Sequence, residues 1–244
     1  MNKMRMTGFY LLVIGLFFAL PGFSQEEVPV NEDVYTEETG LWSTIDLGKK
    51  WDNGIAINFE EETRTRDNFM TTDRFMTSFD LSYKPVKFLK AGASYTRISY
   101  NKEGKESTNY LPYWEKRNRY CAYVQGEYSL GRFEVSLKER FQSTYRIGVK
   151  AKDDRANPKF LLRSKMGLSY DVKGISLQPF VSYEMQHSLN DPTGVNGLVG
   201  SRFAVGVGYE FNDGVSVECG YIRDMDKEDL VKVSVLSLGI GYSF

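Results

Sequence analysis

The sequence predicts an all-β protein, an antiparallel transmembrane β-barrel with short periplasmic turns and longer extracellular loops. Three observations favour this fold. Apolar and polar residues alternate with a period of two over most of the chain after residue 40, as expected for strands with two unlike faces. Short and long connections between the predicted strands alternate along the chain. The last predicted strand is an apolar alternation that ends on Phe244.

The composition agrees with a β protein and excludes several other classes. Aromatic residues make up 14% of the 244 residues, and the chain has 22 glycines, an enrichment typical of strands and turns. The formal net charge of -1 argues against a nucleic-acid-binding protein, which carries a clear basic excess. A mean hydropathy of -0.40 argues against a bundle of membrane helices, since each helix needs about 20 consecutive apolar residues.

Residues 1–24 have the features of a cleaved signal peptide. Lys3 and Arg5 supply the positive start, residues 9–20 form the apolar run, and Gly22 and Ser24 precede the expected cleavage site. A membrane anchor is the alternative, but the apolar run is too short to cross a bilayer. The mature chain then begins with an acidic lead over residues 25–40 and continues as a barrel over residues 41–244.

Most predicted strands have ten or more residues, long enough for a tilted strand to cross a bilayer. They lie near residues 41–50, 54–66, 73–84, 87–100, 117–129, 132–146, 159–172, 175–187, 200–211, 214–225 and 232–244. Their phases put Cys121 and Cys219 on opposite faces, so we expect two packed thiols rather than a disulfide, although export places them in an oxidising compartment.

These candidates number about eleven, whereas bacterial single-chain barrels close with an even number of strands. A weak strand within residues 28–36 would give about twelve strands, the preferred count. Leaving residues 41–50 outside the barrel would give about ten.

Connections of two lengths separate the predicted strands. Tight turns lie near residues 52–54, 84–87, 130–131, 172–174 and 212–214, and longer polar links at 67–72, 101–116, 148–158, 188–199 and 226–230. This alternation predicts that the tight turns face the periplasm. The longest link, 101–116, could form a lid, contact a partner or be disordered.

The last strand carries the most specific signal. Its apolar positions end with Tyr242 and Phe244, which predicts recognition by the outer-membrane barrel assembly machinery and insertion into the outer-membrane bilayer. The alternative is an exported soluble β-sandwich that merely ends on Phe.

On several stretches the chain resembles the outer-membrane barrel family catalogued as domain of unknown function twenty-four-ninety. These stretches are residues 41–42, 49–51, 59–64, 89–95, 162–165 and 203–210. The family tends to follow a tyrosine with an arginine, whereas here Thr96 separates Tyr95 from Arg97. The resemblance implies an outer-membrane barrel and brings no established activity.

The polar face predicts a lumen lined by both signs of charge. The candidate lumen-lining residues are Glu60, Glu62, Arg64, Lys138, Arg140, Arg163, Lys165, Arg202 and Glu210. A small monomeric pore or passive solute carrier is the predicted function. A closed barrel acting structurally or through partners at its loops is the alternative, and the near-balanced signs favour acid–base pairs that fill the interior.

Catalysis is not predicted, and neither is a cofactor or a metal. The lone histidine, His187, lies near the rim with Ser188 and Asp191. A second possibility for a rim-sited hydrolase pairs His187 with the carboxylates of Asp224 and Asp226. A single histidine at a strand end is more often a rim residue.

Aromatic residues near predicted strand ends are expected to form girdles at the two membrane interfaces. These residues are Trp42, Trp51, Tyr83, Trp114, Tyr170 and Tyr209.

Overall fold

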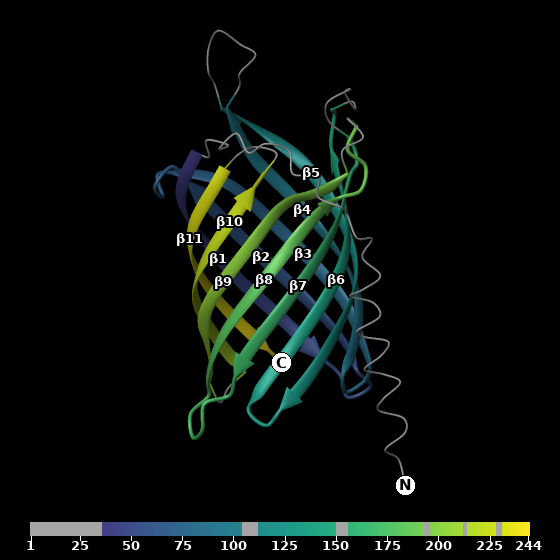
Figure 1. Cartoon of the computed structure of the whole chain (residues 1–244), viewed down its shortest axis with the longest axis vertical. Coiled ribbons are helices and arrows are strands. Elements are labelled where there is room, and N and C mark those ends of the chain that lie inside the picture. The colour runs from purple at the N-terminus through teal and green to yellow at the C-terminus, as the bar shows by residue number, and fades with distance from the viewer. Residues whose placement is uncertain (1–35, 104–111, 150–155, 193–195, 212–213, 228–230) are drawn as a thin grey trace, which may run out of the picture. The chain divides into compact units, whose positions relative to one another are not determined.

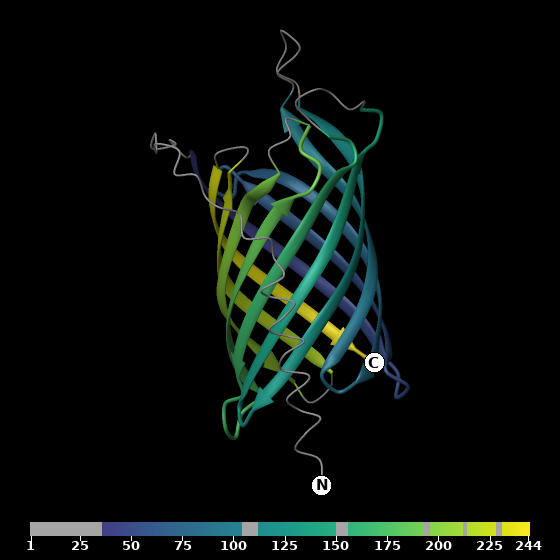
Figure 2. The same ribbon diagram turned by 45° about the vertical axis from the view of Figure 1, so that its right-hand side comes forward.

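The computed structural model describes residues 36–103, 112–149, 156–192, 196–211, 214–227 and 231–244, which form a closed barrel of eleven strands (Figures 1 and 2). The strands are β1 (Thr36–Lys50), β2 (Ile55–Arg66), β3 (Thr71–Val86), β4 (Leu89–Glu103), β5 (Pro112–Leu130), β6 (Phe133–Arg146), β7 (Lys159–Tyr170), β8 (Leu177–Ser188), β9 (Gly197–Glu210), β10 (Val215–Asp226) and β11 (Val231–Ser243). No helix long and apolar enough to cross a bilayer occurs in this part of the chain.

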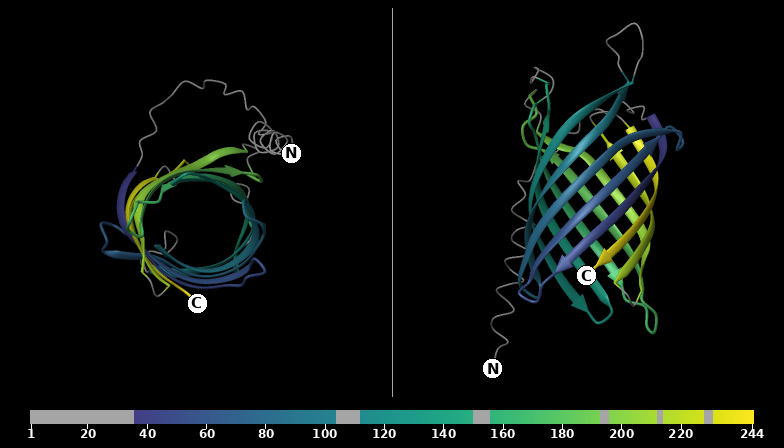
Figure 3. Two further views of the ribbon diagram at one scale, coloured as in Figure 1. Left: turned by 90° about the horizontal axis from the view of Figure 1, so that it is seen from below. Right: turned by 180° about the vertical axis from the view of Figure 1, so that it is seen from behind.

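The first and last strands close the barrel side by side and in parallel. β1 pairs with β11 from Thr36 opposite Val231 to Gly48 opposite Ser243, and every other pair joins sequence neighbours in antiparallel orientation. Figure 3 shows β1 and β11 running in the same direction. The prediction of a wholly antiparallel barrel is therefore wrong at this one seam.

The strand count corrects both predicted numbers. The segment 41–50 belongs to β1 inside the barrel, which excludes ten strands. β1 is hydrogen-bonded to β2 on one edge and to β11 on the other, so no edge is left for a twelfth strand. β1 also begins at Thr36, within the predicted lead; the rest of the suggested extra strand, residues 28–35, lies outside the described residues.

Alternation along the strands separates an apolar exterior from a polar interior. On β3, Phe79 and Leu81 are 56% and 58% exposed. Ser82, the next residue after Leu81, is only 4% exposed. The two cysteines follow the predicted phases and both are free thiols, with Cys121 buried and Cys219 exposed. The expectation of two packed thiols is therefore correct for Cys121 and wrong for Cys219. Exposed apolar side chains over a whole barrel surface mark contact with something other than water.

We name the two ends of the barrel by the strand ends that lie there. β4 ends at Glu103, β6 at Arg146 and β8 at Ser188 at one end, here termed the outer end, and Phe244 lies at the other, the inner end (Figure 1). β4 and β5 extend to Glu103 and Pro112, so half of the predicted 101–116 link is strand, and residues 104–111 lie outside the described part. Trp114 stacks on Phe75 with ring centroids 5.5 Å apart.

Of the six predicted girdle residues, four are exposed, Tyr170 is half-buried and Trp42 is buried. Trp51, Tyr83, Trp114 and Tyr209 are exposed on the exterior, as expected for girdle positions. Trp42 is 8% exposed and faces the interior of the barrel, so the girdle prediction is wrong for this residue. Its inward direction follows from alternation, because the large exterior side chains of β1 are at odd positions such as Ile45.

Towards the inner end, aromatic side chains fill the interior above glycines. The Tyr123 hydroxyl donates a 2.9 Å hydrogen bond to Asp80, and its ring covers Gly92, where a Cβ would lie 2.6 Å from the ring. The Phe180 ring covers Gly206 in the same way, at 2.7 Å. The close approach of ring and backbone requires the absence of a side chain at both glycines.

This packing makes Gly206 a stability determinant. The Cβ of a Gly206→Ala variant would lie 2.6 Å from the Cys219 carbonyl oxygen and 2.7 Å from the Phe180 ring. We expect this overpacking to lower the free energy of unfolding by about 1–3 kcal/mol, measured by urea titration of folded protein in detergent. Gly208→Ala is the matched control, because its Cβ would meet nothing nearer than 3.9 Å. Equal stability of the two variants would contradict the packing argument.

Candidate functional site

A cavity of about 630 Å³ opens inside the outer end of the barrel. Its walls carry ten lysine or arginine side chains and five carboxylates, a net difference of five positive charges. The basic residues are Arg64, Arg66, Arg74, Lys102, Arg117, Arg119, Arg146, Lys159, Arg163 and Arg202. They come from strands β2 to β9, and each faces inward because of its position in the alternation.

The excess of positive charge was hidden in the sequence totals. The whole chain is nearly neutral, and this balance favoured pairing throughout the lumen. The structure instead gathers the arginines at the outer end, because the acids Asp46, Glu60, Asp80 and Glu218 do not line the outer cavity. Lys90, Lys138 and Lys165 do not line it either, so both signs of charge occur outside it.

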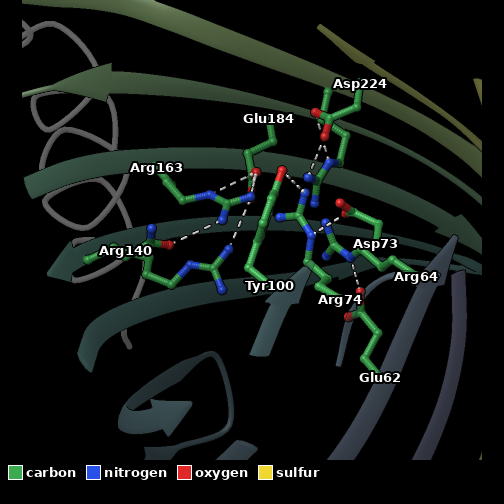
Figure 4. A network of polar contacts seen from close by, with 11 residues as sticks. Glu62, Arg64, Asp73, Arg74, Tyr100, Arg140, Arg163, Glu184 and Asp224 are labelled. Atoms are coloured by element: carbon green, nitrogen blue, oxygen red, sulfur yellow. Dashed lines mark hydrogen bonds and ion pairs between the residues drawn. The ribbon is translucent and has the colours of Figure 1, made fainter. Parts of the chain in front are cut away.

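Glu184 holds the lower wall of the cavity together. Arg163 donates from Nε to Glu184 Oε1 at 3.0 Å and again from Nη2, and Arg140 donates to Glu184 Oε2 at 3.2 Å (Figure 4). Arg163 also donates to Gln142 Oε1 at 3.2 Å. Glu184 and Arg163 are 5% and 7% exposed, so this is a buried carboxylate shared by two guanidinium groups from β6 and β7.

A second group of contacts is centred on Trp42. The Arg64 guanidinium lies 3.5 Å from the centroid of the Trp42 ring, and that of Arg202 lies 4.6 Å from it. Arg64 pairs with Glu62, and Arg202 binds Asp224 through two hydrogen bonds of 3.2 and 2.8 Å. Desolvated cation–π contacts of this kind are worth on the order of 2 kcal/mol. Sequence reasoning missed Trp42 as an interior residue.

A third group lies on β3, β4 and β5. Arg74 donates to Asp73 at 2.5 Å and to the Tyr100 hydroxyl at 3.2 Å, as Figure 4 shows. The guanidinium groups of Arg74 and Arg117 lie 4.3 and 4.6 Å from the centroid of the Tyr100 ring, and Arg117 pairs with Glu115.

The structure brings together five of the nine predicted lumen-lining residues. Glu62, Arg64, Arg140, Arg163 and Arg202 belong to the network just described. Their alternation with exterior apolar residues was the signal that identified them.

The other four predicted residues take no part in the hydrogen bonds and ion pairs described above, although Lys165 lies opposite Glu184 across the β7–β8 pair. Lys138 lies 3.9 Å from the centroid of the Tyr123 ring, opposite Lys165 across the β6–β7 pair. Glu60 is on the inward face of β2, one inward position further from the cavity than Glu62. Glu210 ends β9 at the inner end and is exposed.

Arg119 is a site residue that the sequence prediction left out. It lines the cavity from β5, where it lies opposite Thr96 on β4 and Thr144 on β6. It has the same parity as Gln125 and Glu127 on that strand, so extending the inward alternation of β5 towards residue 117 would have identified it.

The residues considered for catalysis are not assembled into one site. Ser188, Asp191, Asp224 and Asp226 line the cavity. Gln186 and Ser188 line the cavity, so His187, which lies between them on β8, faces the exterior. The absence of enzymatic activity remains a prediction.

At the inner end, the C-terminal aromatic residues lie on the exterior. Tyr242 and Phe244 are 44% and 61% exposed and stack with centroids 6.0 Å apart. The Phe244 amide donates to the Gly48 carbonyl at 3.0 Å, and Lys49 lies 4.9 Å from the centroid of its ring.

The apolar exterior, closed sheet and charged interior define a β-barrel of the outer-membrane type. The chain belongs to the family described as Protein of unknown function (DUF2490), which matches residues 39–229. This match confirms the resemblance found in the sequence. No curated protein matches the chain.

Two solved structures are similar to this chain at low sequence identity. The NanC porin in a rhombohedral crystal form has a TM-score of 0.51 and 12% identity, covering 80% of this chain and 92% of that one. The OmpT expressed in the outer membrane of Vibrio cholerae has a TM-score of 0.42 and 12% identity, covering 75% of this chain and 56% of that one. The first likeness shows the barrel fold alone.

Proposed function

We propose that this barrel spans the outer membrane and acts as a small pore or passive carrier that favours anionic solutes. The exposed apolar exterior and the family membership support the location. The observation that carries the preference for anions is that ten basic side chains and five carboxylates line the cavity walls, because charged linings set the sign of the ions that enter a pore. Glu62, Glu115 and Glu184 pair with three of these arginines and offset part of the positive excess.

A closed barrel is the second candidate, and one observation favours it. Arg140 and Arg163 both donate to Glu184, and Arg163 also donates to Gln142, so these contacts link β6, β7 and β8 at the wall of the cavity. Buried pairs of this kind fill a small barrel and stabilise it without any transport.

Planar-bilayer recording under a potassium chloride gradient separates the two candidates. We expect stable conductance steps with a reversal potential of the sign that chloride permeation gives. Silence over many verified insertions would favour the closed barrel.

A separate experiment tests the location. We expect unheated protein to migrate faster than boiled protein on gels and to be recovered in the outer-membrane fraction. Recovery as a soluble periplasmic protein would contradict the proposed location.

Charge-neutralising variants test the cause of the selectivity. Replacing Arg74 and Arg117 by glutamine removes two cavity charges and should lower the chloride-to-potassium permeability ratio. The matched control replaces Lys87 and Lys173, two exposed lysines in the turns at the inner end, and should leave that ratio closer to wild type. A larger shift in the control than in the cavity variant would contradict the assignment.

A further inference from the structure

Arg119 differs from the other arginines of the cavity network in having no acidic partner. The partnered residues are Arg64 with Glu62, Arg74 with Asp73, Arg117 with Glu115, Arg140 and Arg163 with Glu184, and Arg202 with Asp224. Among the described residues, no carboxylate lies within 4.0 Å of the Arg119 guanidinium, and its buried Nε has no hydrogen-bond partner.

The surroundings of Arg119 do not supply the missing negative charge. Its neighbours across the two strand pairs, Thr96 and Thr144, are neutral. The basic groups that act on it electrostatically are Arg163, then Arg64 and Arg140. A desolvated guanidinium among other cations is unfavourable unless an anion compensates it, so this part of the cavity favours an anionic ligand more strongly than the rest of its wall.

The chemistry of this cluster defines the class of ligand. A guanidinium group presents a planar fork of N–H donors that matches the two oxygens of a carboxylate or phosphate. Arg163 is already held by Glu184 and Gln142, so it contributes positive charge beside the site while Arg119 retains its donors. An anion with two charges would interact with both residues.

We infer that Arg119 is the anion-binding residue of the cavity and takes the carboxylate or phosphate group of a solute that enters from the outer end. This inference rests on the proposed function, since it names the class of solute that the pore or carrier selects. Arg119 binds the anion directly, and Arg163 assists through its charge.

Trp42 offers a local reporter for binding. The chain has three tryptophans; Trp42 faces the cavity against Arg64 and Arg202, whereas Trp51 and Trp114 are exposed on the exterior. A Trp51→Phe, Trp114→Phe variant therefore leaves Trp42 as the only indole. An anion that rearranges the neighbouring guanidinium groups should change its fluorescence.

The experiment titrates this variant in detergent with inorganic phosphate, succinate, acetate and glucose at constant ionic strength. We expect a saturable change with phosphate or succinate, a weaker one with acetate and none with glucose. Whichever of phosphate and succinate binds more tightly identifies the preferred group. Adding Arg119→Gln should weaken binding by on the order of tenfold, and Arg119→Lys, which keeps the charge but loses the fork, should lie between.

Folding and transport controls keep the outcomes distinct. Arg119→Gln should fold at least as well as its parent, because it removes an uncompensated charge, and its gel shift on heating checks this. Unchanged affinity in Arg119→Gln, or no saturable response to any anion, would overturn the site. If anion-selective conductance persists in that case, the pore stands and only the site is wrong. Binding without conductance would instead support the site and contradict the pore.

Discussion

Replacing Glu184 by glutamine is expected to lower the free energy of unfolding by about 3–5 kcal/mol, the range found when one partner of a buried ion pair is removed. Glu184 is 5% exposed and accepts hydrogen bonds from both Arg163 and Arg140. Glutamine has nearly the same shape but no charge, so two guanidinium groups would lose their counter-charge in an enclosed interior. Urea titration of the folded fraction in detergent measures the loss.

Two further variants test whether the stability loss comes from this ion network or from any glutamate-to-glutamine change in the barrel. Glu210→Gln makes the same chemical change at an exposed site and should alter stability by less than about 0.5 kcal/mol. In the double variant Glu184→Gln, Arg163→Gln, the buried excess charge is reduced, and we expect part of the lost stability to return. A double variant less stable than Glu184→Gln alone would contradict this account.

Replacing Phe244 by alanine is expected to reduce the amount of folded protein in the outer membrane to a minor fraction, through impaired assembly. Phe244 is 61% exposed, so its removal costs little packing inside the protein. Its ring is presented together with Tyr242 on the exterior of the closing strand, the position that the assembly machinery is expected to read. Heat-modifiable gel shift of membrane fractions measures the folded amount.

Phe211→Ala is the matched control for this prediction. Phe211 lies just after β9 at the same end, is 51% exposed and contacts Tyr209 with centroids 4.8 Å apart. Both variants should refold from urea into detergent as the wild type does, whereas only Phe244→Ala should accumulate poorly in cells. Equal accumulation of the two variants would show that the terminal residue carries no special signal.

The sequence allowed the strands and their facing to be predicted because both depend on local alternation. Phe79 and Leu81 are exterior, Arg64 and Arg163 are interior, and Cys121 and Cys219 lie on opposite faces, all as their parity indicates. The family resemblance was available for a similar reason, since it rests on short stretches that recur within single strands.

Properties that depend on how distant strands meet were not predictable in this way. The strand number follows from β1 bonding to β11, a contact between the two ends of the chain that no local pattern records. Trp42 was assigned to a girdle because aromatic residues at strand ends usually lie there, yet its parity and its contacts with Arg64 and Arg202 place it inside.

The basic cavity was hidden for the same physical reason. A total charge near zero is compatible with any distribution along the axis. The excess at the outer end arises because arginines from strands far apart in the sequence, such as Arg64 and Arg163, share one level of the barrel.

The parallel seam has a consequence for the path of the polypeptide. A barrel with an even number of strands returns the chain to the side from which it started, whereas eleven strands give one net crossing. Thr36 therefore lies at the outer end and Phe244 at the inner end. With the tight turns in the periplasm, an epitope placed immediately before Thr36 should be labelled by antibody on intact cells, and one placed after Phe244 only in permeabilised cells. We therefore expect the two ends of this barrel to lie in opposite compartments.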